Sequence, residues 1–135
     1  FFHHFLNKSP LFFANEGQIA SILIESGASI THKDDDGLTA LHVSAERGNV
    51  EVCKVLIEKG ADVNALDGKK LAMFVNQTPL HKAVDNNRED VVKLLLDSGA
   101  QIKVLDISRQ SPEAIAKAKK LYEIIIFQFF APFWD

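Results

Sequence analysis

The sequence predicts an all-α solenoid in which short helix-turn-helix units stack side by side along one axis. Two observations lead to this prediction. Groups of residues recur along the 135-residue chain at shared intervals, and the apolar residues between them follow helical periodicity. A unit of two short helices cannot bury its own apolar stripe, so neighbouring units must cover one another and form an elongated array.

Three sets of residues recur with the same period. Glycine–alanine pairs begin at Gly27, Gly60 and Gly99, and the second interval is longer than the first. Aspartates follow the same two intervals, at Asp34, Asp67 and Asp106. A Thr-x-Leu-His motif occurs at residues 39–42 and again at residues 78–81. We therefore expect a single domain of four units, at approximately residues 1–33, 34–66, 67–105 and 106–135, with six extra residues inserted after Asp67.

Each unit is expected to hold two helices. Thr39 and Thr78 favour the position before a helix, where a side-chain oxygen accepts an unpaired backbone N–H, and Pro79 suits the first helical turn. Gly60 and Gly99 are expected to end second helices, because glycine adopts the left-handed conformation needed there. The second helices carry apolar residues at i, i+3 and i+4: Ile19, Ile22 and Leu23; Val52, Val55 and Leu56; Val91, Leu94 and Leu95.

Two segments closely resemble the ankyrin-repeat family. Residues 34–42 (DDDGLTALH) together with residues 60–65 (GADVNA) match its consensus, and residues 77–81 (QTPLH) match it nearly as well. Residues 111–128 resemble a terminal repeat, in which Ala114 replaces the histidine and Lys120 replaces the inter-helix glycine. Residues 9–27 resemble a first repeat that lacks about three residues between its helices.

The resemblance implies a fold, a function and a role for two histidines. The fold is a set of helix-turn-helix units joined by β-hairpin-like finger loops, and the function is to bind protein partners through a concave face. In that family the histidine joins neighbouring repeats through backbone hydrogen bonds, so His42 and His81 are expected to be structural. We expect a non-enzymatic protein-protein interaction module without a cofactor. An architectural slice of a longer solenoid, and an inhibitory subunit that masks an enzyme or transcription factor, stay open as alternatives.

Composition and motifs argue against several other classes of protein. Hydrophobic residues make up 47% of the chain and charged residues 24%, as in ordinary soluble domains. A net charge of −3 argues against nucleic-acid binding, which normally uses a basic surface. No apolar segment reaches the length of about 20 residues that a membrane helix needs, and no catalytic motif is present. Because Cys53 is the single cysteine, we expect a reducing intracellular compartment, either cytoplasmic or nuclear.

Three clusters of polar residues suggest other chemistry, and each has a simpler interpretation. His3 and His4 are adjacent, so their side chains diverge and make a poor metal pair. Residues 34–37 (DDDG) resemble the start of a calcium loop, but Val43 stands where an EF-hand requires glutamate. The lysines within residues 117–120 are typical of a solvated helix face. We expect neither a metal site nor a nucleic-acid or membrane contact.

The candidate partner-binding residues are those that the resemblance places on finger tips and on the exposed faces of first helices. Most are polar, and residues 34–36 are all acidic, which favours a partner with a basic segment. The set comprises Asp35, Asp36, Leu38, Glu46 and Arg47 in the second unit, Gln77, Asp85 and Asn86 in the third, and Ile107, Ser108, Gln110 and Lys119 in the fourth.

The six-residue insertion lengthens one finger and carries unusual apolar residues. Leu71, Met73, Phe74 and Val75 lie within residues 68–77, where an exposed loop is normally polar. Because large apolar side chains serve as anchors in protein interfaces, we hypothesise that this finger inserts Met73 or Phe74 into a partner. The alternative is that these side chains fold back and cover the adjacent finger.

Both ends of the chain are rich in aromatic residues. Phenylalanines occur within residues 1–5, and residues 127–134 contain four phenylalanines and a tryptophan. Large apolar patches are rarely exposed on monomers, so three explanations stay open: the ends cap the solenoid, dock on another domain, or form a dimer. We expect a monomer that caps itself at the C-terminal end. Because the sequence begins with Phe1, we also expect it to be a piece of a longer protein.

Overall fold

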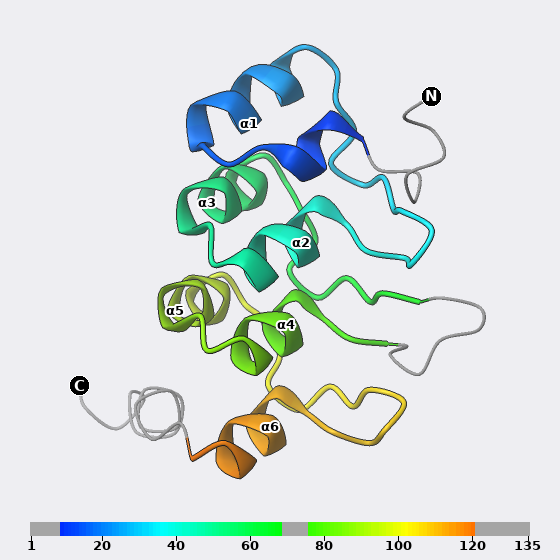
Figure 1. The fold of residues 1–135 in the computed structure, drawn as a ribbon, viewed down its shortest axis with the longest axis vertical. Helices are drawn as coiled ribbons and strands as arrows, with labels where there is room; N and C mark the ends of the chain where they lie inside the picture. Colours follow the sequence, from blue (N-terminus) through cyan, green and yellow to red (C-terminus); the bar gives the residue numbers. More distant parts are fainter. Residues whose placement is uncertain (1–8, 69–75, 121–135) are drawn as a thin grey trace.

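The protein is built from two columns of short helices (Figure 1). This computed structural model describes residues 9–68 and 76–120. One column holds the first helix of each unit and the other holds the second helices, and each helix contacts its counterpart in the next unit. No described residue belongs to a β-strand, so the predicted all-α fold is confirmed. The elements are η2 (Pro10–Phe13), α1 (Gly17–Glu25), α2 (Ala40–Arg47), α3 (Val50–Glu58), α4 (Pro79–Asp85), α5 (Glu89–Asp97) and α6 (Pro112–Ala118).

The first helices begin after hydroxyl-bearing N-cap residues. Thr39 and Thr78 precede α2 and α4, and the Oγ1 atom of each accepts a hydrogen bond from the backbone N–H of the histidine three residues later. Ser111 caps α6 in the same way, accepting the N–H of Ala114 at 3.1 Å. These caps satisfy backbone N–H groups that have no partner inside the helix, so each helix starts at the same point of its unit.

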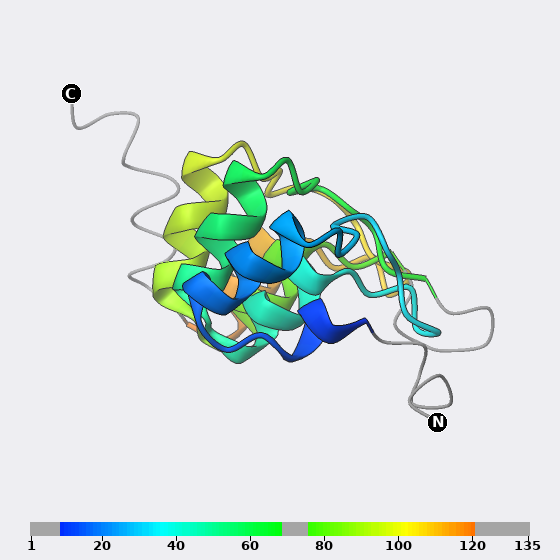
Figure 2. The same cartoon turned by 90° about the horizontal axis from the view of Figure 1, so that it is seen from above.

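Three loops lie beside the column of first helices (Figures 1 and 2), and we call them finger 1 (residues 29–38), finger 2 (62–77, described at 62–68 and 76–77) and finger 3 (101–110). Each finger closes where a buried aspartate donates its backbone N–H to the residue before the N-cap. In finger 1 this bond joins Asp34 to Leu38 at 2.9 Å, and in finger 2 it joins Asp67 to Gln77 at 2.9 Å. The insertion therefore lengthens finger 2 without changing how its base closes.

The second helices bury a slightly different face from the one predicted. The fully buried residues are Val52, Cys53 and Leu56 in α3, and Val91, Val92 and Leu95 in α5. Cys53 faces the first helix of its own unit, because its Sγ atom lies 3.3 Å from the Oγ atom of Ser44 in α2. Val55 is only half-buried and packs on the neighbouring α1, near Gly17. Each second helix therefore contacts neighbours on two sides, which a single stripe does not describe.

In the first unit, the predicted stripe is wrong for two of its three residues. Ile19 and Ile22 are 41% and 60% exposed, whereas Ala20 is fully buried. Their counterparts in the second unit, Val52 and Val55, face neighbouring helices. The main contacts of α1 are with η2 and α3, so no described helix covers the side on which these two isoleucines lie.

Candidate functional site

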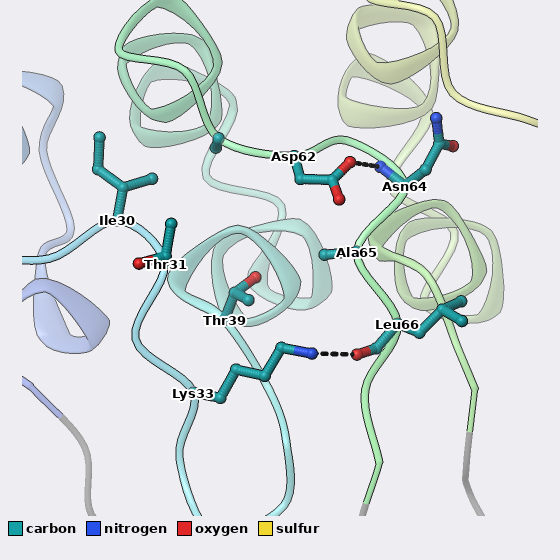
Figure 3. Close-up of a pocket in the computed structure, with 9 residues that line it drawn as sticks. Ile30, Thr31, Lys33, Thr39, Asp62, Asn64, Ala65 and Leu66 are labelled. Carbon is teal, nitrogen blue, oxygen red and sulfur yellow. Dashed lines mark hydrogen bonds between the residues drawn. The ribbon is translucent and has the colours of Figure 1, made fainter.

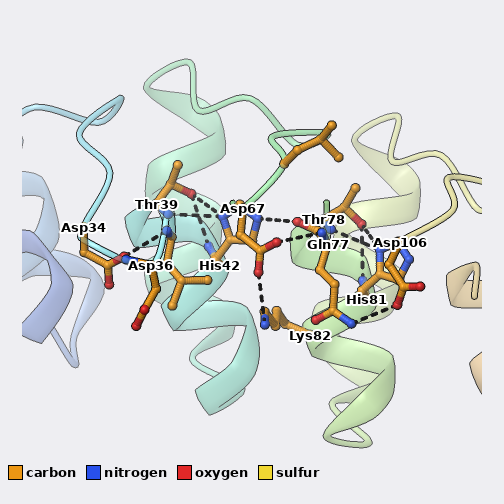
Figure 4. Close-up of polar contacts among 12 residues, drawn as sticks. Asp34, Asp36, Thr39, His42, Asp67, Gln77, Thr78, His81, Lys82 and Asp106 are labelled. Atoms are coloured by element: carbon orange, nitrogen blue, oxygen red, sulfur yellow. Dashed lines mark hydrogen bonds and ion pairs between the residues drawn. The ribbon is translucent and has the colours of Figure 1, made fainter. Parts of the chain in front are cut away.

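Two histidines join neighbouring units at the base of the fingers (Figure 4). The Nε2 atom of His42 lies 2.9 Å from the carbonyl oxygen of Gln77, and that of His81 lies 3.0 Å from the carbonyl oxygen of Gln110. On the other side of each ring, Nδ1 accepts the backbone N–H of the N-cap threonine. A carbonyl oxygen only accepts hydrogen bonds, so Nε2 carries the proton in both rings.

Burial keeps both rings neutral. Removal from water lowers the pKa of His42 from 6.5 to about 4, although its hydrogen bond to the Gln77 carbonyl acts in the opposite direction. Burial likewise lowers the pKa of His81. Both nitrogens of each ring are engaged within the protein, so these histidines hold the array together and have no nitrogen available for a substrate or a metal ion.

A row of polar contacts continues from finger 2 to finger 3 (Figure 4). The Nζ atom of Lys82 in α4 lies 3.3 Å from Oδ2 of Asp67, whose side chain is almost completely buried. The side-chain amide of Gln77 donates to Oδ2 of Asp106 in the next finger, at 3.1 Å. Gln77, one of the predicted partner-binding residues, therefore uses its side chain to connect two fingers.

Basic side chains also reach from one unit to the end of the first helix of the preceding unit. Arg47 donates from Nη1 to the carbonyl oxygen of Phe12 at 2.9 Å, and Arg88 donates from Nε to that of Glu46 at 3.0 Å. Lys119 contacts the backbone carbonyl of Asp85 and also pairs with its carboxylate at 3.4 Å. These cations lie at helix C-termini, where unpaired carbonyls and the helix dipole favour positive charge. Arg47, Asp85 and Lys119 thus take part in contacts between units.

The other predicted partner-binding residues differ in exposure. Asp36, Leu38 and Asn86 are half-buried, and the side chain of Asn86 donates to the carbonyl of Lys82 at 2.8 Å. The exposed residues lie on finger 1, on finger 3 and at the end of α2: Asp35, Glu46, Ile107, Ser108 and Gln110. Leu71, Met73, Phe74 and Val75, together with His3, His4 and the aromatic ends of the chain, lie outside the described residues.

Sequence reasoning missed a groove of about 440 Å³ between finger 1 and finger 2, which we call groove 1 (Figure 3). It was missed because motif and periodicity arguments address helices and caps rather than gaps between loops. One signal was available: Thr31 and Asn64 hold the same position in successive units, so a short side chain replaces a carboxamide in one finger. The lining residues of groove 1 include Ile30, Thr31 and Lys33 from finger 1, and Ala61, Asp62 and Leu66 from the neighbouring loop.

Over residues 9–68 and 76–120, no three histidine, cysteine or acidic side chains lie close enough together to hold a metal ion. In the same part of the chain, no helix has the length and apolar character needed to cross a membrane.

Comparisons with known proteins match the repeated part of the chain. A family model described as ankyrin repeats (3 copies) matches residues 11–106. The chain is 42% identical over 52 residues to acyl-CoA-binding domain-containing protein 2 of Arabidopsis thaliana, covering 37% of this chain and 15% of that protein. It is 42% identical over 53 residues to the ankyrin repeat and KH domain-containing protein mask of Drosophila melanogaster, covering 39% and 1%.

A third relative is the palmitoyltransferase akr1 of Aspergillus oryzae, which is 44% identical over 48 residues, covering 36% of this chain and 6% of that protein. The matched part thus amounts to 15% or less of the length of each of these three curated relatives.

Proposed function

We propose that the finger tips and first helices of this chain bind a protein partner without catalysing a reaction. The chain belongs to the ankyrin-repeat family, which is the premise of this proposal. Ankyrin repeats are protein-interaction modules, and stacked repeats present one long surface without needing a pocket in any single unit. The partner, its binding mode and the absence of catalysis are the parts that we propose for this chain.

One observation carries the proposal: the polar residues along this surface divide into two groups. Gln77, Arg47 and Lys82 hold neighbouring elements together through hydrogen bonds or ion pairs. The exposed side chains of Asp35 and Glu46 take part in no such contact among the described residues. Side chains that the fold does not use remain available to a partner, and they lie beside elements that these contacts hold together.

The charge of these exposed residues suggests the chemistry of the partner. Asp35 and Glu46 both lie in the second unit and both are acidic. Complementary charge speeds association and selects among partners more than it raises affinity. We propose that the partner presents a basic segment to this unit.

Finger 2 is the proposed specificity element. Its base closes through Asp67 and Gln77 in the same way as the bases of fingers 1 and 3, so the additional residues fall between two anchored ends. We propose that Met73 or Phe74 inserts into a partner. The alternative is that these side chains fold back and cover the adjacent finger. Large apolar side chains surrounded by polar ones are typical anchors of interfaces.

A second candidate function is architectural. The exposed Ile19 and Ile22 of α1 occupy positions that neighbouring units cover elsewhere in the array, which favours one segment of a longer solenoid. An inhibitory subunit would use the same finger surface as the main proposal. We propose a monomer in a reducing intracellular compartment, cytoplasmic or nuclear.

Affinity capture with matched baits tests the main proposal. Glu46→Lys reverses a charge on the proposed surface, whereas Glu58→Lys makes the same change at an exposed position of α3 on the second column. We expect Glu46→Lys to lose a partner that the original chain and Glu58→Lys both retain. A third bait with residues 68–77 shortened to a tight turn tests finger 2. Equal capture by all folded baits would contradict the proposed surface.

A further inference from the structure

The two gaps between neighbouring fingers are built differently. In the gap between fingers 2 and 3, the carboxamide of Asn64 forms a bridge to the next loop. Its Nδ2 atom donates to the carbonyl oxygen of Gly99 at 3.3 Å, and its Oδ1 atom accepts the backbone N–H of Gln101 at 2.9 Å. One side chain therefore satisfies a backbone acceptor and a backbone donor that lie two residues apart.

Groove 1 lacks this bridge. Thr31 stands at the equivalent position, and its hydroxyl lies 3.2 Å from the Oγ atom of Ser29 within the same finger. Figure 3 shows this hydroxyl turned away from Asp62. The backbone groups that correspond to Gly99 C=O and Gln101 N–H are Gly60 C=O and Asp62 N–H, and no hydrogen bond among the described residues reaches either of them.

A different residue bridges the two fingers at the other edge of groove 1. Lys33 donates from Nζ to the carbonyl oxygen of Leu66 at 2.9 Å, which links the two fingers beyond the missing bridge (Figure 3). Ile30, Ala61 and the partly exposed Leu66 supply apolar walls to the space of about 440 Å³. The result is a preformed slot with apolar walls. The N–H of its lining residue Asp62, and the C=O of Gly60 next to the lining residue Ala61, take part in no hydrogen bond among the described residues.

We propose that groove 1 binds the carboxamide side chain of an asparagine or glutamine in an extended segment of a protein partner. The amide nitrogen of that side chain donates to Gly60 C=O and its oxygen accepts from Asp62 N–H, as Asn64 does within the chain. This inference rests on the proposed function, because it names the partner chemistry that one part of the finger surface recognises.

Other side chains fit the slot less well. An anionic side chain would provide two acceptors and no donor, and it would approach the carboxylate of Asp62. A lysine would provide donors only and would approach the ammonium group of Lys33. A carboxamide is neutral and carries a donor and an acceptor on one planar group, which matches the pair of backbone groups.

The test uses the whole chain labelled with ¹⁵N and two blocked tripeptides, acetyl-Ala-Asn-Ala-N-methylamide and its Leu-centred counterpart. The two peptides share their backbone and differ in one side chain of similar size. We expect the asparagine peptide to shift the amide resonance of Asp62 saturably, with a dissociation constant of about 1–10 mM for so small a ligand. The leucine peptide should leave that resonance without a saturable shift.

Two variants complete the test. Thr31→Asn places a carboxamide at the position of the missing bridge, so it should occupy both backbone groups and abolish the peptide-induced shift. Thr31→Val has nearly the shape of threonine and cannot bridge, so it should retain binding. No shift at Asp62 up to about ten times the expected dissociation constant, equal shifts by the two peptides, or unchanged binding by Thr31→Asn would each overturn the inference. Because the readout is local to Asp62, failure here leaves the capture experiment on Glu46 unaffected, and the two proposals fail separately.

Discussion

Helices α1 and α3 carry similar apolar patterns and bury different amounts of them. Val52 of α3 is 1% exposed, whereas Ile19, its counterpart in the first unit, is 41% exposed. The difference arises from the helices of the second column. Helix α3 lies between α1 and α5, whereas among the described helices of that column α1 has a neighbour, α3, on one side. In a solenoid, the burial of a residue thus depends on the adjacent unit as much as on its own helix.

The joints between units show the same contrast. The second and third units each use a neutral histidine, whose Nε2 donates to a carbonyl of the next finger. In the first unit, Phe12 stands at the histidine position, and its ring packs edge-on against His32, with the ring centroids 6.0 Å apart. The inner joints therefore depend on the hydrogen bonds and protonation state of a histidine, whereas η2 meets finger 1 through an aromatic ring contact and its Phe12 carbonyl accepts a hydrogen bond from Arg47 of the second unit.

Truncating a buried leucine should have the largest effect on stability. Compared with truncation of an exposed isoleucine, it tests whether the inner helix is covered more fully than the outer one. Leu56→Ala, at a fully buried position of α3, should lower the free energy of unfolding by about 2–5 kcal/mol. Ile22→Ala, at a 60% exposed position of α1, should change it by less than about 1 kcal/mol. Urea titration followed by circular dichroism measures both. Equal losses would show that α1 is covered as fully as α3.

Acid should weaken the histidine joints. The pKa of His42 in the folded chain is about 4, below the ordinary value of 6.5, so the unfolded chain binds a proton first as the pH falls. The stabilisation that depends on neutral His42 is therefore fully present above about pH 6.5. About 3 kcal/mol of the free energy of unfolding is lost as the pH falls towards 4. Burial of His81 acts in the same direction. Urea titrations at several pH values measure the loss.

The control for this prediction is His42→Asn. This variant should be less stable at neutral pH, because the bond to Gln77 is lost, but its stability should depend less on pH between 6.5 and 4. If the original chain and the variant show the same pH dependence, protonation of His42 is not what weakens the fold in acid.

Two glycines with left-handed backbones compare a crowded site with an open one. At Gly37 (φ +76°), an added Cβ would lie 2.3 Å from the backbone nitrogen of Gly68, whereas at Gly60 (φ +100°) it would meet nothing within 4 Å. Gly60→Ala should cost about 1–2 kcal/mol from backbone strain alone. Gly37→Ala should cost more, because finger 1 and finger 2 must also separate. Thermal unfolding ranks the two variants, and an equal cost would mean that the fingers separate easily.

The smallest expected effects come from exchanging the residues that distinguish the two gaps between fingers. Thr31→Asn should raise the free energy of unfolding by about 0.5–1.5 kcal/mol, since it adds a bridge across groove 1. Asn64→Thr should lower it by a similar amount, since it removes the bonds to Gly99 and Gln101. Opposite signs in urea titrations are the expected outcome. Changes of the same sign would show that the two gaps are not equivalent.

Much of the fold could be predicted from local residue chemistry. Thr39 and Thr78 indicate where helices begin, because a hydroxyl before a helix satisfies backbone N–H groups. The spacing of Asp34, Asp67 and Asp106 places the fingers and the insertion. The candidate site was less predictable: Arg47 and Asp85 lie where a partner could contact them, yet both make contacts between units.

The sequence by itself therefore determined the helices, their caps and the period of the array, since each depends on short motifs that can be read directly along the chain. Only the tertiary structure decided that Val55 is half-buried, that Ile19 is exposed, and that groove 1 is open. These properties depend on which atoms of the next unit lie opposite a side chain. Periodicity within one unit carries no information about them, because the facing residues belong to a different unit, a full period away in the chain.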